Sequence, residues 1–292
     1  MGAPRRVLPG KTYLITRRCY QRTFRLRPSS RTNQIFLYCL AWAAQKTGVV
    51  VHAVCVMSNH HHMVVTDVDG VLPDFLRELH RTVAKALNAA QGQWENLWNM
   101  GPTSVVLLPT LDDVRRKIGY VVANPVESGL VELPAHWPGV LLWGEHRVAV
   151  ARPERYFAPG GNSPATIELV IAAPAESVAL PGWAAGVAAE IAGRVNEAHR
   201  SMSVLGLRFL GRAAVLAASF VARATSYEEK RRLAPTVAAV CRDVRIRVLK
   251  EWRSFQGEYR KALTAWRGGE RAAVFPVGTW WMRVHHAAPV AA

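Results

Sequence analysis

Apolar residues in the first half of the chain follow two different periods, which predicts a mixed fold of helices and strands. Residues 31–46 and 72–90 carry apolar side chains at helical spacing. In the second stretch, Phe75, Leu79 and Val83 lie on one stripe. Strands are predicted where β-branched and apolar residues run together, at 12–16, 49–56, 60–66 and 105–108.

A third amphipathic helix is expected between Thr110 and Asn124. Thr110 can cap its first turn, where Asp112 and Asp113 interact favourably with the helix dipole. Pro125 disfavours helical geometry in the residue before it, so the helix is expected to end near Asn124. These elements together indicate an α+β domain.

The pattern changes after residue 152 and predicts a second region. Residues 158–164 are rich in Gly and Pro, as in a linker, and Ala-rich helical patterns dominate from 167 to about 267. We therefore predict a domain at 1–157 and a mainly helical, basic region at 158–292. The aromatic segment Phe275–His286 is expected to pack back onto the protein.

The charge of the chain points to a polyanionic partner. The 292 residues include 37 Lys and Arg and 21 Asp and Glu, a net charge of +16. Such a field attracts nucleic acid first and anionic membrane second. Ten basic residues precede Asp67, the first acidic residue: Arg5, Arg6, Lys11, Arg17, Arg18, Arg22, Arg25, Arg27, Arg31 and Lys46.

Other features of the composition exclude several classes of protein. Half of the residues are hydrophobic, which excludes disorder throughout the chain. No apolar run is long enough to span a bilayer, and no apolar stretch follows the basic N-terminus, so we expect a soluble, unexported protein without a membrane partner. The cysteines are scattered without a Cys-x-x-Cys pair, which favours reduced and mostly buried thiols.

The most informative segment is the histidine run at the predicted hairpin. Residues 57–59 (Met-Ser-Asn) are turn-like and separate two apolar strands. On a strand, His60 and His62 point to one face and His61 to the other. Two imidazoles on one face can bind a divalent metal, although surface or hydrogen-bonded core histidines explain such a run about as well.

The helix after Thr110 offers further candidates for this site. Tyr120 and Asn124 lie one turn apart on one face, with Arg116 one turn earlier. Asn124 can supply an amide oxygen to a metal, Tyr120 a phenol nucleophile, and Arg116 a contact to phosphate. The alternative is that Tyr120 is an ordinary aromatic residue packed on the sheet.

Two motifs, in this order, resemble those of the single-tyrosine HUH transposases, specifically the REP-associated tyrosine transposases. The first is Asn-His-His-His at 59–62, and the second is Tyr-Val-Val-Ala-Asn-Pro-Val-Glu-Ser-Gly-Leu-Val at 120–131. The resemblance covers residues from about 8 to 150. It implies a ferredoxin-like antiparallel sheet with helices, the fold of an HUH nuclease domain.

The resemblance also implies residue roles and an activity. His60 and His62 match paired metal ligands, Asn124 completes the metal site, and Tyr120 matches the nucleophile. The activity so implied is cleavage and rejoining of single-stranded or hairpin DNA with Mg²⁺ or Mn²⁺, through a 5′-phosphotyrosine intermediate. The implied location is the cytoplasm, at the bacterial nucleoid, and the protein would be a monomer or a homodimer.

Three interpretations stay open from the sequence. The first is the DNA strand transferase described above, with Arg17, Arg18, Arg22 and Arg116 as DNA-binding residues. The second is a non-catalytic DNA-binding or repressor protein derived from such an enzyme. The third is a nicking enzyme of the same chemistry that acts on RNA or at a replication origin.

The C-terminal region carries its own signal for nucleic acid. Basic and aromatic residues interleave between Lys230 and Arg271, including Tyr259, Arg260 and Trp266. Such a helix suits phosphate contact combined with base stacking. A basic helix with a solvated face, whose tryptophans pack inward, is an equally good interpretation.

Overall fold

The computed structural model describes residues 4–154, 157, 163–225 and 235–291. The strands are β1 (Lys11–Arg18), β2 (Val50–Met57), β3 (His60–Asp67), β4 (Ser104–Leu108), β5 (Leu141–Trp143), β6 (His146–Ala151) and β7 (Thr166–Ile171). The helices are α1 (Ser30–Thr47), α2 (Leu72–Gln91), α3 (Leu111–Glu127), α4 (Trp183–Val204), α5 (Arg212–Ala217), α6 (Arg242–Arg267) and α7 (Trp281–His286). Short 3-10 helices are η1 (Tyr20–Arg22), η2 (Pro134–His136) and η3 (Ala175–Ser177).

The first four strands and two helices form a ferredoxin-like unit. The order along the chain is β1, α1, β2, β3, α2, β4, and the strands lie in the sheet as β4-β1-β3-β2. Every neighbouring pair in this set is antiparallel. The predicted fold class is therefore confirmed, together with the hairpin between β2 and β3, although its turn is limited to Ser58 and Asn59 because Met57 belongs to β2.

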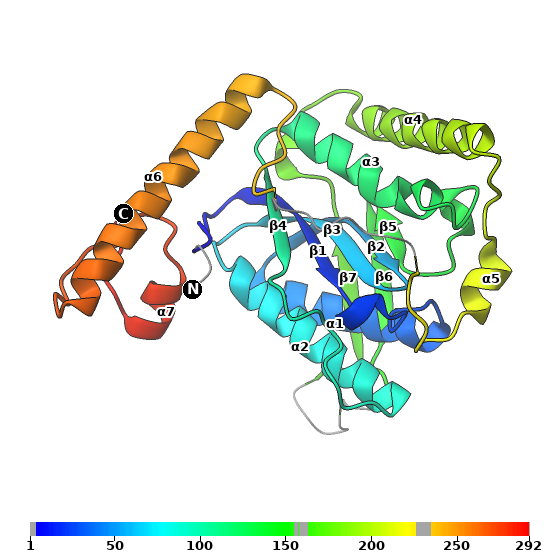
Figure 1. Ribbon diagram of the computed structural model, residues 1–292, viewed down its shortest axis with the longest axis horizontal. Coiled ribbons are helices and arrows are strands. Elements are labelled where there is room, and N and C mark those ends of the chain that lie inside the picture. The colour runs from blue at the N-terminus through cyan, green and yellow to red at the C-terminus, as the bar shows by residue number, and fades with distance from the viewer. Residues whose placement is uncertain (1–3, 155–156, 158–162, 226–234, 292) are drawn as a thin grey trace.

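The sheet separates two hydrophobic cores, because side chains alternate between its faces. Helices α1 and α2 cover one face, and α3 with α4 covers the other (Figure 1). On β1, Ile15 belongs to the core under α1 and α2, whereas Leu14 belongs to the core under α3. Val65 and Val64 on β3 divide in the same way.

Helix α3 differs at its C-terminal end from the expectation. It was expected to end near Asn124, but it continues through Pro125 to Glu127. Proline disfavours the helical conformation of the preceding residue without forbidding it, and here Val126 is fully buried in the core under the helix. Burial of this last turn offsets the local steric cost.

The sheet extends beyond the predicted domain. Strand β7 pairs in parallel with β2 and antiparallel with β6, so the whole sheet is mixed rather than antiparallel. The expectation that residues from 167 onward are helical is wrong for β7, whose alternating exposed and buried positions mark a strand. The predicted boundary at residue 158 lies outside the described residues and stays a prediction.

The helices that follow β7 are arranged in two groups. Helix α4 packs along α3, whereas α6 and α7 stand apart from the sheet beside the N-terminus (Figure 1). A backbone hydrogen bond from Val7 N to Gly278 O, 2.9 Å long, joins the two ends of the chain. Phe275 and Met282 are buried against α6, as expected for the aromatic C-terminal segment.

The cysteines and the hydropathy of the helices complete the description of the fold. Cys19, Cys39 and Cys55 are buried and Cys241 is exposed, in line with mostly buried thiols. Among the described helices, none combines the length and apolar character that a membrane span needs.

Candidate active site

His60 and His62 face α3 from the end of β3 that follows the hairpin turn. Their ring centroids are 4.7 Å apart. Strand β1 pairs Thr16 with His62 and Arg18 with His60. Directly paired residues of neighbouring strands share a face, so these four side chains form one polar cluster at the edge of the α3 core.

Each of the two imidazoles is oriented by a hydrogen bond at Nδ1. His62 Nδ1 lies 2.7 Å from Thr16 Oγ1, and His60 Nδ1 lies 2.6 Å from Asn59 Oδ1. An Nδ1–H donated to an oxygen places the remaining lone pair on Nε2, which is the arrangement of metal-binding histidines. Burial, followed by the neighbouring His60, holds the pKa of His62 well below its usual value, so its imidazole is neutral.

Tyr120 reaches the histidines from α3. Its hydroxyl lies 3.4 Å from His62 Nε2, and the two rings are 5.2 Å apart between centroids. The helix is fixed at its start by a capping box, in which Thr110 Oγ1 accepts from Asp113 N and Asp113 accepts from Thr110 N. Helix α3 thus lies on the same side of the sheet as His60 and His62.

Asn124 lies one turn after Tyr120 and is buried. Its Oδ1 atom has no hydrogen-bond partner among the described residues. A buried carbonyl oxygen without a partner costs free energy, roughly 1–3 kcal/mol, unless a ligand satisfies it. This oxygen is thus a suitable donor for a hard cation.

The donor set can be tested against a metal ion. Within the described part of the chain, no cluster of three or more His, Cys, Asp or Glu side chains is placed to hold one. His60 and His62 offer two imidazole nitrogens, and Asn124 offers one amide oxygen. Such a set fits an ion that takes further oxygens from water and phosphate, as Mg²⁺ and Mn²⁺ do.

Two cationic side chains near Tyr120 were not anticipated. Lys117 Nζ is 5.4 Å, and Arg194 Cζ 5.8 Å, from the centroid of the Tyr120 ring. Burial and then the charge of Arg194 lower the pKa of Lys117. Lys117 precedes Tyr120 by three residues, so helical spacing could have indicated it, but no sequence signal places α4 and Arg194 there.

The four arginines predicted to bind DNA occupy different surroundings. Arg18 lies on the histidine face, and Arg22 accepts at its carbonyl a 3.4 Å hydrogen bond from Asn59. Arg17 points to the opposite face and donates to the carbonyls of Asn99 and Gly101. Arg116 donates to Asp112 over 3.0 Å. Of the four, Arg18 is thereby placed with the histidines, and DNA contact stays a prediction for all four.

His61 lies on the other face of the sheet, as predicted. Its Nε2 atom is 3.1 Å from Nε2 of His80 on α2. The rings of Phe36 and Trp98 pack edge-on against it, at 5.3 and 5.6 Å between centroids. His61 is therefore part of the core under α1 and α2 and takes no part in the site.

Comparison with known proteins gives distant structural likenesses. A REP-associated tyrosine transposase bound to a REP hairpin matches at 21% identity and a TM-score of 0.40, over 48% of this chain and 81% of the other. A candidate transposase from Deinococcus radiodurans R1 matches at 21% identity and a TM-score of 0.30, over 42% of this chain and 97% of the other. No protein-family model and no curated protein matches the sequence. Function is therefore inferred below from the side chains of the site.

Proposed function

We propose that this protein is a metal-dependent DNA strand transferase that cleaves and rejoins single-stranded DNA through Tyr120. The observation that carries the proposal is the position of the Tyr120 hydroxyl, 3.4 Å from Nε2 of the histidine that would bind the metal. A structural tyrosine would not need two oriented imidazoles and an unpaired amide oxygen on the same face. The net charge of +16 agrees with a DNA substrate.

The reaction would be an in-line displacement at one phosphodiester. Tyr120 Oη forms a bond to phosphorus and gives up its proton, while the bond from phosphorus to the 3′ oxygen breaks. The departing 3′ oxygen takes up a proton and leaves as a hydroxyl. The phosphate stays joined to Tyr120 and to the 5′ oxygen of the downstream strand, so a second 3′-hydroxyl can reverse the step and join two strands.

The residues around Tyr120 would have separate roles. His60, His62 and Asn124 would hold Mg²⁺ or Mn²⁺, which supplies charge that polarises the phosphate oxygens. Lys117 and Arg194 place positive charge beside the phenol, where it would stabilise the negative charge that develops on Tyr120 Oη as the phenol loses its proton.

Covalent capture tests the proposal. Single-stranded hairpin DNA, labelled at its 5′ end in one sample and at its 3′ end in another, is incubated with the protein and Mn²⁺. The products are then separated under denaturing conditions. We expect an adduct that carries only the 3′ part of the strand, because the phosphate that stays on the protein belongs to that part. The adduct should disappear in Tyr120→Phe and persist in Tyr20→Phe, which alters an exposed tyrosine.

Two results would overturn the proposal. An adduct that forms in Tyr120→Phe would assign the nucleophile to another residue. Tight DNA binding by the wild type without any adduct, at every concentration of Mg²⁺ and Mn²⁺ tested, would instead identify a non-catalytic DNA-binding protein.

A further inference from the structure

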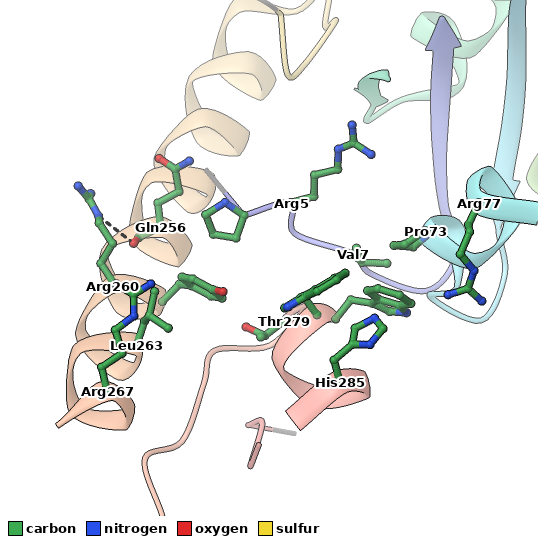
Figure 2. A pocket seen from close by; sticks show the side chains of 14 residues that line it. Arg5, Val7, Pro73, Arg77, Gln256, Arg260, Leu263, Arg267, Thr279 and His285 are labelled. Carbon is green, nitrogen blue, oxygen red and sulfur yellow. Dashed lines mark hydrogen bonds between the residues drawn. The ribbon is translucent and has the colours of Figure 1, made fainter. Parts of the chain in front are cut away.

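A large cavity lies between the C-terminal helices and the start of α2, away from the histidine cluster. It has a volume of about 1110 Å³ and is lined from α2, α6, α7 and the N-terminal segment. Figure 2 shows Arg77 of α2 on one side, Arg260 and Arg267 of α6 on the other, and His285 of α7 between them. We call this cavity the C-terminal groove.

The charge of the C-terminal groove is of one sign. Among the described residues that line it, Arg5, Arg77, Arg260 and Arg267 are basic and none is acidic. Outside the lining, Asp74 forms an ion pair with Arg77 at 2.6 Å, which orients that guanidinium along α2. A basic cavity of this kind attracts a polyanion.

Aromatic rings form the floor of the C-terminal groove. Trp281 stacks on His285 with 3.9 Å between centroids and an interplanar angle of 36°. Trp281 is still 57% exposed, so much of its indole faces solvent. Trp280 and Tyr259 also line the cavity, but both are buried. An exposed, already immobilised indole beside arginines suits stacking of an unpaired base.

The C-terminal groove exists because the two ends of the chain meet. Besides the bond from Val7 to Gly278, Arg6 forms an ion pair with Glu251 of α6 at 3.3 Å. Gly278 has φ +91°, and a Cβ there would lie 2.8 Å from Arg6 Cγ. Glycine is thus needed both for the turn and for the close approach of the N-terminal segment.

We infer that the C-terminal groove binds single-stranded DNA, with bases stacked on Trp281 and phosphates held by its arginines. This strand site is separate from the site of chemistry at Tyr120. Duplex DNA is disfavoured because its bases are already stacked and cannot reach the indole. Each of the two interpretations of the α6 sequence holds for part of the helix. Tyr259 and Trp266 pack inward on Phe275, whereas Arg260 and Arg267 line the groove and can contact phosphate.

Binding is tested in EDTA and in a Tyr120→Phe background, so that no chemistry at the active site is required. The probe is fluorescein-labelled (dT)20, which forms no hairpin, and anisotropy gives the dissociation constant at several salt concentrations. Trp281→Ala should weaken binding by about 5- to 150-fold, the effect of one stacked base, and Trp281→Phe should restore most of it. The matched control is Trp94→Ala, because Trp94 is 88% exposed and follows the opposite end of α2.

The arginines are tested by the salt dependence of the same measurement. Loss of one phosphate contact should reduce the slope of log K against log salt by about 0.7 for a single strand. We expect this change for Arg260→Gln and none for Arg245→Gln, an exposed arginine nearer the start of the same helix. A (dT)20 probe with 5-iodouracil should also crosslink to the peptide that contains Trp281.

The inference is overturned if Trp281→Ala and Arg260→Gln bind (dT)20 as tightly as the parent and the crosslinks lie elsewhere. It is also overturned if duplex DNA or polyglutamate competes as well as (dT)20, since either result would leave a non-specific basic surface. Groove binding without any Tyr120 adduct would refute the proposed function alone. An adduct without groove binding would refute only this inference.

Discussion

Three successive histidines of β3 lie in two different surroundings on the two faces of the sheet. His60 and His62 are held at Nδ1 by Asn59 and Thr16, and His62 Nε2 faces Tyr120. His61 contacts His80 and is enclosed by aromatic rings, and its buried Nδ1 atom finds no hydrogen-bond partner in the described part of the chain. The same side chain is thus oriented by hydrogen bonds beside Tyr120 on one face and packed as a core residue on the other.

The candidate site is therefore defined by the partners of each imidazole rather than by the presence of histidine. An imidazole becomes a metal ligand when one nitrogen is fixed by a hydrogen bond and the other faces an open position with further donors. On the α3 face, Nδ1 of His62 is fixed by Thr16, and Oδ1 of Asn124 has no hydrogen-bond partner among the described residues, which supports the proposed metal site. On the other face, Nε2 of His61 meets the imidazole of His80, and its buried Nδ1 has no hydrogen-bond partner among the described residues.

The largest effect is expected from the same substitution made on each face. His62→Leu should lower the yield of the Tyr120 adduct by more than about 100-fold, because loss of even an outer partner of a metal ligand costs about 10- to 100-fold. His61→Leu should leave the yield nearly unchanged in the folded protein. Its free energy of unfolding should change by about 1–3 kcal/mol, since His80 loses a hydrogen-bond partner.

The comparison requires that both variants remain folded, which circular dichroism and urea unfolding would establish. Similar losses of adduct in His61→Leu and His62→Leu, at equal folded fractions, would contradict the assignment of the two faces.

A smaller effect is expected when only the orientation of His62 is changed. Thr16→Val removes the oxygen that holds His62 Nδ1 and should raise the Mn²⁺ concentration for half-maximal adduct by about 10- to 100-fold. Thr12→Val is the control, because Thr12 lies at the other end of β1 and pairs with Thr66 Oγ1. An unchanged Mn²⁺ requirement in Thr16→Val would show that the hydrogen bond does not support ligation.

Much of this arrangement could be predicted from the sequence because its signals are local. Strand alternation separated His61 from His60 and His62, and helical spacing placed Tyr120 and Asn124 on one face. The ends of α1 and α2 follow from Gly48 and Gly92, which both take the left-handed conformation that glycine favours.

What could not be predicted depends on contacts between distant segments. In the sequence, strand β7 lies at the start of the Ala-rich region, but in the structure it joins the sheet by pairing with β2 and β6. The placement of Arg194 beside Tyr120 depends on how α4 packs on α3. His80 as the partner of His61 likewise depends on the packing of α2 beneath the sheet.

The packing of α4 on α3 offers the next test. Gly119 precedes Tyr120, and a Cβ there would collide with Glu190 Cγ of α4 and lie 3.2 Å from its Cβ. Gly119→Ala should therefore destabilise the protein by about 1–3 kcal/mol and lower the adduct yield, because Arg194 follows Glu190 by one turn. A Cβ at Gly193 would meet no atom of other described segments within 4 Å, so Gly193→Ala should stabilise α4 by about 0.5–1 kcal/mol. Equal stability changes in both variants would contradict this packing.

The smallest effect concerns the dependence of stability on pH, to which His80 on the α1 and α2 face contributes. Burial, with the nearby charges of Arg17 and Arg5, lowers the pKa of His80 to about 3. The unfolded chain binds a proton at this residue near pH 6.5, so between about pH 6.5 and 3 it holds more protons than the folded protein. The free energy of unfolding must then fall as the pH falls, by up to about 2 kcal/mol from this residue between pH 7 and 5.

His80→Gln separates this contribution from packing, because glutamine can still hydrogen-bond to His61 but does not titrate. Urea unfolding of the metal-free protein at pH 7 and pH 5 should show a smaller loss of stability in His80→Gln than in the wild type. The adduct yield at pH 7 should change little, since His80 lies across the sheet from Tyr120. Parallel losses in the two proteins would mean that His80 does not contribute to the acid sensitivity.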